Sequence, residues 1–145
     1  MTKFHVVDAQ HAWVKHVIEQ NVDQLLDLYA TGTPNEPLLF KPTLAANIRL
    51  DRAAARSYFL GGNPDYPDDH GFLNRGWTQV RFESAAGPIR SAGGSSYMDM
   101  GHYTFVDGGG SATRADYTFV YHKLDGRVLI SLHHSSLAWV SPAEV

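Results

Sequence analysis

Four long segments with the composition of β-strands fill the second half of the chain and constrain its fold more than any other feature. They are rich in aromatic and β-branched residues and cover residues 76–85, 95–106, 112–124 and 127–140. The short connections "DGGGS" and "LDG" are typical of hairpin turns, so consecutive segments should pair antiparallel. An antiparallel sheet of this size needs other elements to cover at least one of its faces.

Helices in the first half can provide that cover. Apolar residues recur every four positions from Ala9 to Ile18, which predicts a helix over residues 7–20 with Asp8 as its N-cap. Residues 21–30 show a second, shorter amphipathic pattern.

A short strand and a third helix complete the expected elements. "LLFKPT" (38–43) predicts a strand that closes at Pro42. Residues 51–60 predict a helix that begins at Asp51 and stops before Gly61. Helices that precede a run of antiparallel strands indicate an α+β fold, in one domain over residues 1–145. A bent sheet wrapped over helices leaves a cavity between the layers, a common place for a small-molecule site.

Composition excludes several classes of protein. The 145 residues carry a net charge of -3, which gives no electrostatic reason to bind nucleic acid or an anionic membrane. The chain has no cysteine, so disulfides and thiolate metal sites are excluded. No signal peptide or apolar run of membrane length is apparent, and a cytoplasmic protein is expected.

The stretch "LHHSSL" (132–137) carries the most suggestive polar side chains. Strand alternation splits it into two His/Ser pairs on opposite faces. His133 and Ser135 should share one face with Leu129 and Leu137, while His134 and Ser136 should lie on the other. The two histidines therefore cannot bind one metal ion unless other strands supply ligands. Alternatively, both pairs are only polar residues near a strand end, satisfied by backbone groups.

Two apolar stripes suggest more apolar surface than one cavity needs. One comprises Tyr117, Phe119 and Tyr121, and is either core or interface; the other is formed by Val128, Ile130 and Leu132. An apolar sheet face that stays exposed usually finds a partner. We therefore expect a homodimer that forms through the sheets.

Several motifs together resemble a known family. "LLFKPT", "RSYF", "GHYTF" and "YTFVYHKLDGRVLISLHHSS" are similar in order and spacing to bacterial relatives of the calcium/calmodulin-dependent kinase II association domain. That group belongs to the SnoaL-like, nuclear transport factor 2-like proteins. The His-His-Ser-Ser ending resembles the iota-class carbonic anhydrases. The resemblance implies a cystatin-like cone, in which a strongly curved antiparallel sheet packs on the N-terminal helices.

The resemblance also implies a site. Thr43 matches the Pro-Thr that closes the first strand, Tyr58 matches the Tyr of the third helix, and His133 and Ser135 match the pair that faces the cavity. One departure is Asp116, which stands where the family often has arginine. If Asp116 lined the pocket, its carboxylate would oppose a bound anion.

These residues suit the hydration of carbon dioxide to bicarbonate. His133 would act as general base. Ser135 and Thr43 would donate hydrogen bonds to bicarbonate, Tyr58 would orient the water or close the anion site, and Leu129 and Leu137 would form apolar walls. This set contains no carboxylate and no thiolate, which favours a site without a cofactor, although zinc or manganese on His133 or His134 is an alternative.

Two other functions remain open. One is a SnoaL-like enzyme or binding module for a larger hydrophobic molecule, which would need a cleft of several hundred Å³. The other is a non-catalytic oligomerisation domain, whose pocket would be filled or sealed.

Overall fold

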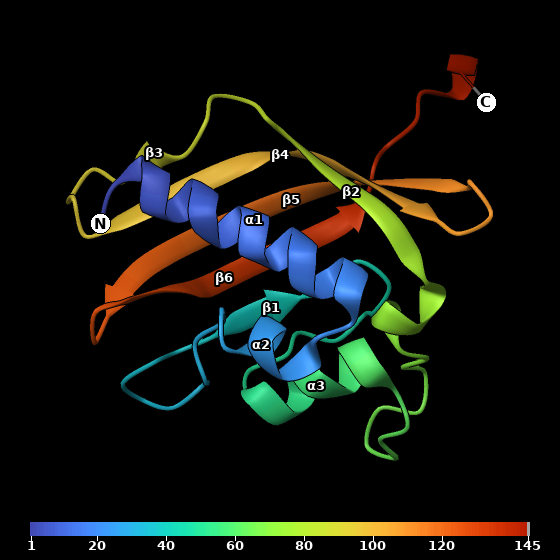
Figure 1. The fold of residues 1–145 in the computed structure, drawn as a ribbon, viewed down its shortest axis with the longest axis horizontal. Helices are drawn as coiled ribbons and strands as arrows, with labels where there is room; N and C mark the ends of the chain where they lie inside the picture. Colours follow the sequence, from blue (N-terminus) through green and yellow to red (C-terminus); the bar gives the residue numbers. More distant parts are fainter. Residues whose placement is uncertain (145) are drawn as a thin grey trace.

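The structure, a computed structural model, describes residues 1–144 as helices on one side of a curved sheet (Figure 1). The helices are α1 (Lys3–Glu19), α2 (Val22–Leu26) and α3 (Arg52–Leu60), with the 3-10 turns η1 (Phe72–Arg75) and η2 (Pro142–Glu144). The strands are β1 (Leu39–Lys41), β2 (Trp77–Ser84), β3 (Ile89–Arg90), β4 (Ser96–Asp107), β5 (Ala112–Leu124) and β6 (Arg127–Leu137). The predicted α+β class is confirmed.

The sheet has the strand order β1-β6-β5-β4-β2, and the short β3 pairs with β4. The four long strands pair antiparallel: β4, β5 and β6 are joined by the two predicted hairpins, and β2 pairs with β4 across a connection that contains β3. β1 instead joins the edge of the sheet parallel to β6, so that Phe40 lies beside His133. The chain can make this parallel connection because a long crossover containing α3 follows β1.

The helix boundaries follow local capping and tertiary pairing. α1 begins earlier than predicted because Thr2 is its N-cap, in a capping box with His5. Asp8 therefore lies inside the helix, and its predicted role as N-cap is wrong. The predicted N-cap of α3 is correct, since the carboxylate of Asp51 accepts a hydrogen bond from the amide of Ala54 at 2.8 Å.

α2 ends earlier than its amphipathic pattern predicts. The backbone around Tyr29 leaves the helix and pairs with β6 instead. The Ala30 amide donates to the Ile130 carbonyl at 2.8 Å, and the Ile130 amide donates to the Leu28 carbonyl at 2.8 Å. This pairing fixes Tyr29 against the last strand of the sheet.

A β-bulge in β6 reverses the alternation of its side chains. Val120 of β5 pairs with Leu132, but Tyr121 pairs with Ile130, so Ser131 is an extra residue. Ile130 consequently points into the core beside Tyr121. Leu129 pairs with His122, and cross-strand partners share a face, so Leu129 points away from the cavity. The predicted faces of Leu129 and Ile130 are therefore wrong.

An aromatic core fills the space between the sheet and the helices. The stripe Tyr117, Phe119 and Tyr121 is fully buried in this core and is not an interface. α1 crosses this face of the sheet, and Trp13 packs against Tyr103 at 5.9 Å between ring centroids. No helix within residues 1–144 combines the length and apolarity needed to cross a membrane.

Candidate active site

His133 lies at the centre of the core, and its side chain is only 2% exposed. Its neighbours on both adjacent strands are phenylalanines at the same register, Phe40 on β1 and Phe119 on β5. The imidazole stacks between them, with ring centroids 4.9 Å from Phe40 and 4.0 Å from Phe119. The ring is held in place by packing on both of its faces.

Both ring nitrogens of His133 contact tyrosine hydroxyls. Nδ1 lies 2.8 Å from Tyr29 Oη, and Nε2 lies 3.0 Å from Tyr103 Oη. The indole Nε1–H of Trp13 also donates to Tyr29 Oη, at 2.9 Å. These partners come from α1, from the segment after α2 and from β4, so the fold brings distant parts of the chain to one imidazole.

Three hydroxyls continue this chain of polar contacts. Tyr103 Oη donates to Ser135 Oγ at 2.5 Å, and Ser135 Oγ is 2.5 Å from Thr43 Oγ1. Ser135 is completely buried, whereas Thr43 is half-buried. The chain therefore runs without interruption from Trp13 through His133 to Thr43.

Burial keeps the site neutral. Burial, and to a smaller extent the neighbouring His134, lowers the pKa of His133 well below its ordinary value. Burial raises the pKa values of Tyr29, Tyr103 and Tyr58. At neutral pH the ring of His133 is uncharged, so one of its nitrogens donates and the other accepts.

The cavity beside His133 is small. Its volume of about 10 Å³ is close to what one water molecule requires. It is lined by Trp13, Phe40, Thr43, Tyr58, Phe59, Phe72, Tyr103, Phe105 and His133. The walls are mostly aromatic, and the polar groups come from Thr43 and from the tyrosine and histidine side chains.

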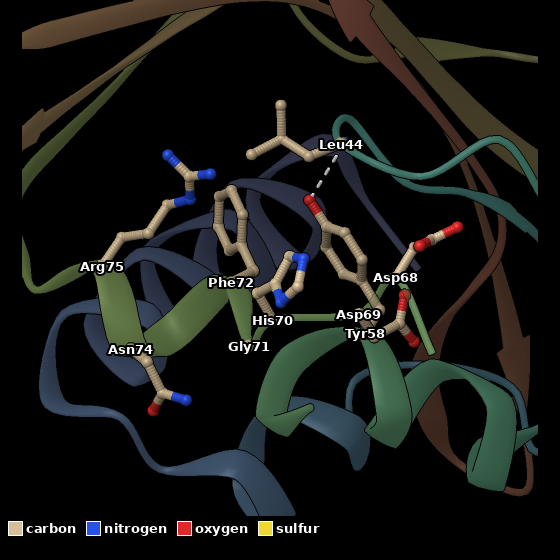
Figure 2. A pocket seen from close by; sticks show the side chains of 9 residues that line it. All are labelled: Leu44, Tyr58, Asp68, Asp69, His70, Gly71, Phe72, Asn74 and Arg75. Carbon is tan, nitrogen blue, oxygen red and sulfur yellow. Dashed lines mark hydrogen bonds between the residues drawn. The ribbon is translucent and has the colours of Figure 1, made fainter. Parts of the chain in front are cut away.

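A larger pocket lies outside this cavity and is called the vestibule below (Figure 2). Its volume is about 220 Å³, and it is lined by Leu44, Tyr58, Asp68, Asp69, His70, Gly71, Phe72, Asn74 and Arg75. Tyr58 and Phe72 line both spaces and so form the wall between them. Tyr58 Oη accepts a hydrogen bond from the Leu44 amide at 3.3 Å, which holds the ring across the opening.

A buried ion pair anchors the loop that forms one side of the vestibule. Arg49 and Asp69 make two hydrogen bonds of 2.7 Å, and Ser57 Oγ donates to Asp69 at 2.5 Å. Burial acts to raise the pKa of Asp69, but the bonds from Arg49 and Ser57 outweigh it and hold that pKa below its ordinary value. The pair fixes His70 and Phe72, which follow Asp69 in the chain.

The structure gathers four of the residues named from the sequence. Thr43, Tyr58 and His133 line the small cavity, and Ser135 is hydrogen-bonded to Thr43 beside it. As expected, His134 is exposed on the other face of β6, and Ser136 lies on that face half-buried.

Two leucines expected as apolar walls lie elsewhere. Leu129 points to the other face because of the bulge. Leu137 is 56% exposed at the end of β6, beyond the part of the sheet that the helices cover. Aromatic side chains form the walls instead, with Phe40 and Phe59 among them.

Asp116 is remote from the cavity. It lies on the outer face of β5, where its Oδ1 is 2.7 Å from His102 Nδ1. Its charge therefore does not oppose an anion at His133.

Sequence reasoning gave no role to Tyr103, Tyr29 and Trp13. Tyr103 lies in "GHYTF", one of the motifs that carry the family resemblance, and that motif was the available signal. In the sequence, Tyr29 and Trp13 fit the apolar positions of predicted helices, and nothing in that pattern indicates contact with His133.

The histidines are not placed for metal binding. Both nitrogens of His133 are occupied by tyrosine hydroxyls, and His134 points the opposite way. In the part of the chain that the structure describes, no three histidine or acidic side chains cluster closely enough to hold a metal ion.

Comparisons with known proteins show the family of the chain. The family described as "Metal-independent carbonic anhydrase" matches residues 5–137. The chain is 33% identical over 161 residues to the metal-independent carbonic anhydrase of Nostoc sp. (strain PCC 7120), an alignment that covers 96% of this chain and 75% of that protein.

Solved structures give the same result. A cyanobacterial iota-carbonic anhydrase complexed with bicarbonate superposes with a TM-score of 0.84 at 31% identity, over 97% of this chain and 94% of that one. A protein from Xanthomonas campestris, described as a calcium/calmodulin-dependent kinase II association domain, gives 0.62 at 28% identity, over 92% and 85%. A nuclear transport factor 2-like protein from Shewanella oneidensis, at 17% identity over 94% and 99%, shares the fold with a TM-score of 0.66. The chain belongs to the family of metal-independent carbonic anhydrases.

Proposed function

We propose that this protein catalyses the reversible hydration of carbon dioxide to bicarbonate, without a metal ion, in the cavity beside His133. The observation that carries the proposal is a hydrogen-bonded row of three hydroxyls, those of Thr43, Ser135 and Tyr103, which ends at a neutral histidine inside an aromatic enclosure. The family, and the bicarbonate bound to a related structure, support it.

His133 acts as general base through Tyr103. The water oxygen forms a bond to carbon while one C=O π pair moves onto oxygen, and the water loses a proton. For this step the Tyr103 hydroxyl turns its proton from Ser135 Oγ to Nε2, 3.0 Å away, and Tyr103 accepts the proton of the water as it passes its own to that nitrogen. In this state Nδ1–H donates to Tyr29 Oη, which also accepts from Trp13. Thr43 and Ser135 donate to the oxygen on which negative charge develops, and Tyr58 orients the water.

The size of the cavity favours a very small substrate. About 10 Å³ beside His133 cannot hold the larger hydrophobic ligand that was the alternative. Even bicarbonate, with four non-hydrogen atoms, needs a local rearrangement. In the free protein the hydroxyls of Thr43 and Ser135 are hydrogen-bonded to each other, and bicarbonate can replace that bond by accepting from both. Tyr58 and Phe72 would move apart to admit it.

The test is stopped-flow hydration of carbon dioxide by protein treated with a chelator. Wild type should be active, and added zinc should not increase its rate. Ser135→Ala should lose about a hundredfold in kcat, as expected for one donor to a developing oxyanion. Ser136→Ala, next in the chain but on the outer face, is the matched control and should stay within about twofold of wild type.

Two results would contradict the mechanism. Activity that chelation abolishes and zinc restores would show a metal-dependent enzyme. Equal losses in Ser135→Ala and Ser136→Ala would show that the hydroxyl at Ser135 has no specific role. Nitrogen-15 NMR of His133 gives an independent check, because the relay requires the proton of the neutral ring to lie on Nδ1.

The outer face of the sheet supports a homodimer, and Leu132 is the one residue of the expected stripes that takes part in its apolar row. Leu39, Leu132, Val120, Met98 and Ile89 are paired in register and form one apolar row across five strands. Leu39, Met98 and Ile89 are each about half exposed, at 50%, 46% and 47%. Burying this row against a second copy would remove it from water. Light scattering should give twice the 16.0 kDa chain mass, and Met98→Glu should give the monomer.

The expected cytoplasmic location stays a prediction.

A further inference from the structure

Arg75 stands out among the charged residues of the vestibule. It is the last residue of η1, and its side chain is exposed and lines the pocket. Within residues 1–143 no carboxylate lies within ion-pair distance of its guanidinium, whereas Arg49, Arg52 and Arg56 each have one. Its positive charge therefore faces the pocket without a partner.

The charges of the vestibule are arranged asymmetrically. Figure 2 shows Arg75 beside Phe72 at one end of the pocket. Asp68 lies at the other end, beyond Tyr58. Asp69 is neutralised by Arg49, so it adds little net charge. An anion in the pocket would be repelled by Asp68 and attracted toward Arg75.

The field of Arg75 reaches the wall between the vestibule and the inner cavity. Burial raises the pKa of Tyr58; the charge of Arg75 opposes this rise, and the charge of Asp69 adds to it by a smaller amount. The guanidinium therefore stabilises negative charge at the Tyr58 hydroxyl. An anion that crosses the wall between Tyr58 and Phe72 passes through this favourable potential.

We infer that Arg75 is an anion-binding residue that holds bicarbonate in the vestibule before or after it crosses the wall formed by Tyr58 and Phe72. The inference rests on the proposed function, because bicarbonate is the charged partner of that reaction. Guanidinium is planar and presents paired N–H groups that match two oxygens of a planar anion. Carbon dioxide carries no charge and gains nothing from this contact.

The reversibility of the reaction determines which kinetic constants can change. The ratio of kcat/KM for hydration to kcat/KM for dehydration is fixed by the equilibrium constant at a given pH, so no substitution can alter it. A residue that stabilises bound bicarbonate without stabilising the transition state leaves kcat/KM unchanged for hydration and for dehydration. Its removal raises KM for bicarbonate and weakens product inhibition by bicarbonate during hydration.

The experiment compares wild type with Arg75→Gln, Arg75→Lys and Arg114→Gln at constant ionic strength. Arg114 is the matched control, because it is exposed and has no carboxylate within ion-pair distance in residues 1–143, but lies on β5 and lines neither the vestibule nor the inner cavity. Sodium bicarbonate is titrated into nitrogen-15-labelled protein, and the amide shifts of Gly76 and Gly71 report occupancy of the vestibule. Product inhibition by bicarbonate is measured in stopped-flow hydration.

Arg75→Gln should weaken bicarbonate binding about three- to tenfold, in the range of a partly shielded charge pair. The bicarbonate affinity of Arg75→Lys should lie between those of wild type and Arg75→Gln, because lysine keeps the charge but loses the paired donors. Arg114→Gln should match wild type, and kcat/KM for carbon dioxide should stay within about twofold in all variants.

The outcomes separate the two proposals. Unchanged bicarbonate binding in Arg75→Gln, or equal weakening in Arg114→Gln, would overturn the inference while an active wild type kept the proposed function. An inactive wild type whose bicarbonate binding falls in Arg75→Gln would overturn the proposed function and keep the anion site.

Discussion

Acidification should destabilise this protein through His133. The ring is 2% exposed, lies between two phenylalanines and has no carboxylate among its hydrogen-bond partners. The pKa of His133 is lowered in the folded state, chiefly by burial, whereas the pKa of a histidine in the unfolded chain is about 6.5. Above that pH both states are neutral and His133 contributes no pH dependence. Below it the unfolded state binds a proton that the folded state does not, so the free energy of unfolding falls.

The size of the effect follows from this difference in proton binding. The loss approaches at most about 1.4 kcal/mol per pH unit, which gives at most about 2 kcal/mol between pH 7 and pH 5. Urea denaturation at several pH values measures it. The pH dependence of wild type minus that of His133→Gln isolates the contribution of His133, because the other titrating groups are common to both proteins.

His134→Gln is the control that separates burial from charge. His134 is exposed and makes the smaller contribution to the lowered pKa of His133, so this variant should keep the wild-type pH dependence. If wild type and His133→Gln lose stability in parallel on acidification, the reasoning is refuted. Direct NMR titration of the His133 ring gives the same answer if His133→Gln fails to fold.

Three further outcomes are expected. Asp51→Ala should cost about 1 kcal/mol in urea denaturation, because the Ala54 amide loses its cap; no change would contradict the capping role. Gly101→Ala should cost about 1–3 kcal/mol or more, because a Cβ there would lie 2.1 Å from the Glu83 carbonyl oxygen; wild-type stability would show that β2 and β4 can separate freely. Asp116→Asn should leave carbon dioxide hydration within about twofold of wild type, because Asp116 faces away from the cavity; a large change would place it in the site.

Strand periodicity predicted the faces of β6 side chains after Ser131 correctly, but it gave the wrong faces for Leu129 and Ile130, which precede the bulge at Ser131. His133 and Ser135 follow Ser131 on a regular stretch of β6, so counting by twos along that stretch gives their faces correctly. Leu129 precedes the bulge, and one extra residue reverses every face before it. Ser131 shows no glycine or other marker of a bulge in the sequence. Only pairing with the neighbouring strand determines it, which is why the apolar walls could not be identified by alternation.

The contacts of Tyr103 explain why the hydrogen-bonded chain could not be read from local sequence. Tyr103 lies on β4, but His133 and Ser135 lie on β6, with β5 between them. The residue of β5 opposite Tyr103 is Ala115, which is completely buried. A methyl group at that position leaves room for the phenol ring to lean across β5, and sheet curvature shortens the path. The contact of Tyr103 with His133 and Ser135 therefore depends on a small residue twelve positions later, a relation that becomes visible only when the β4–β5 register is known.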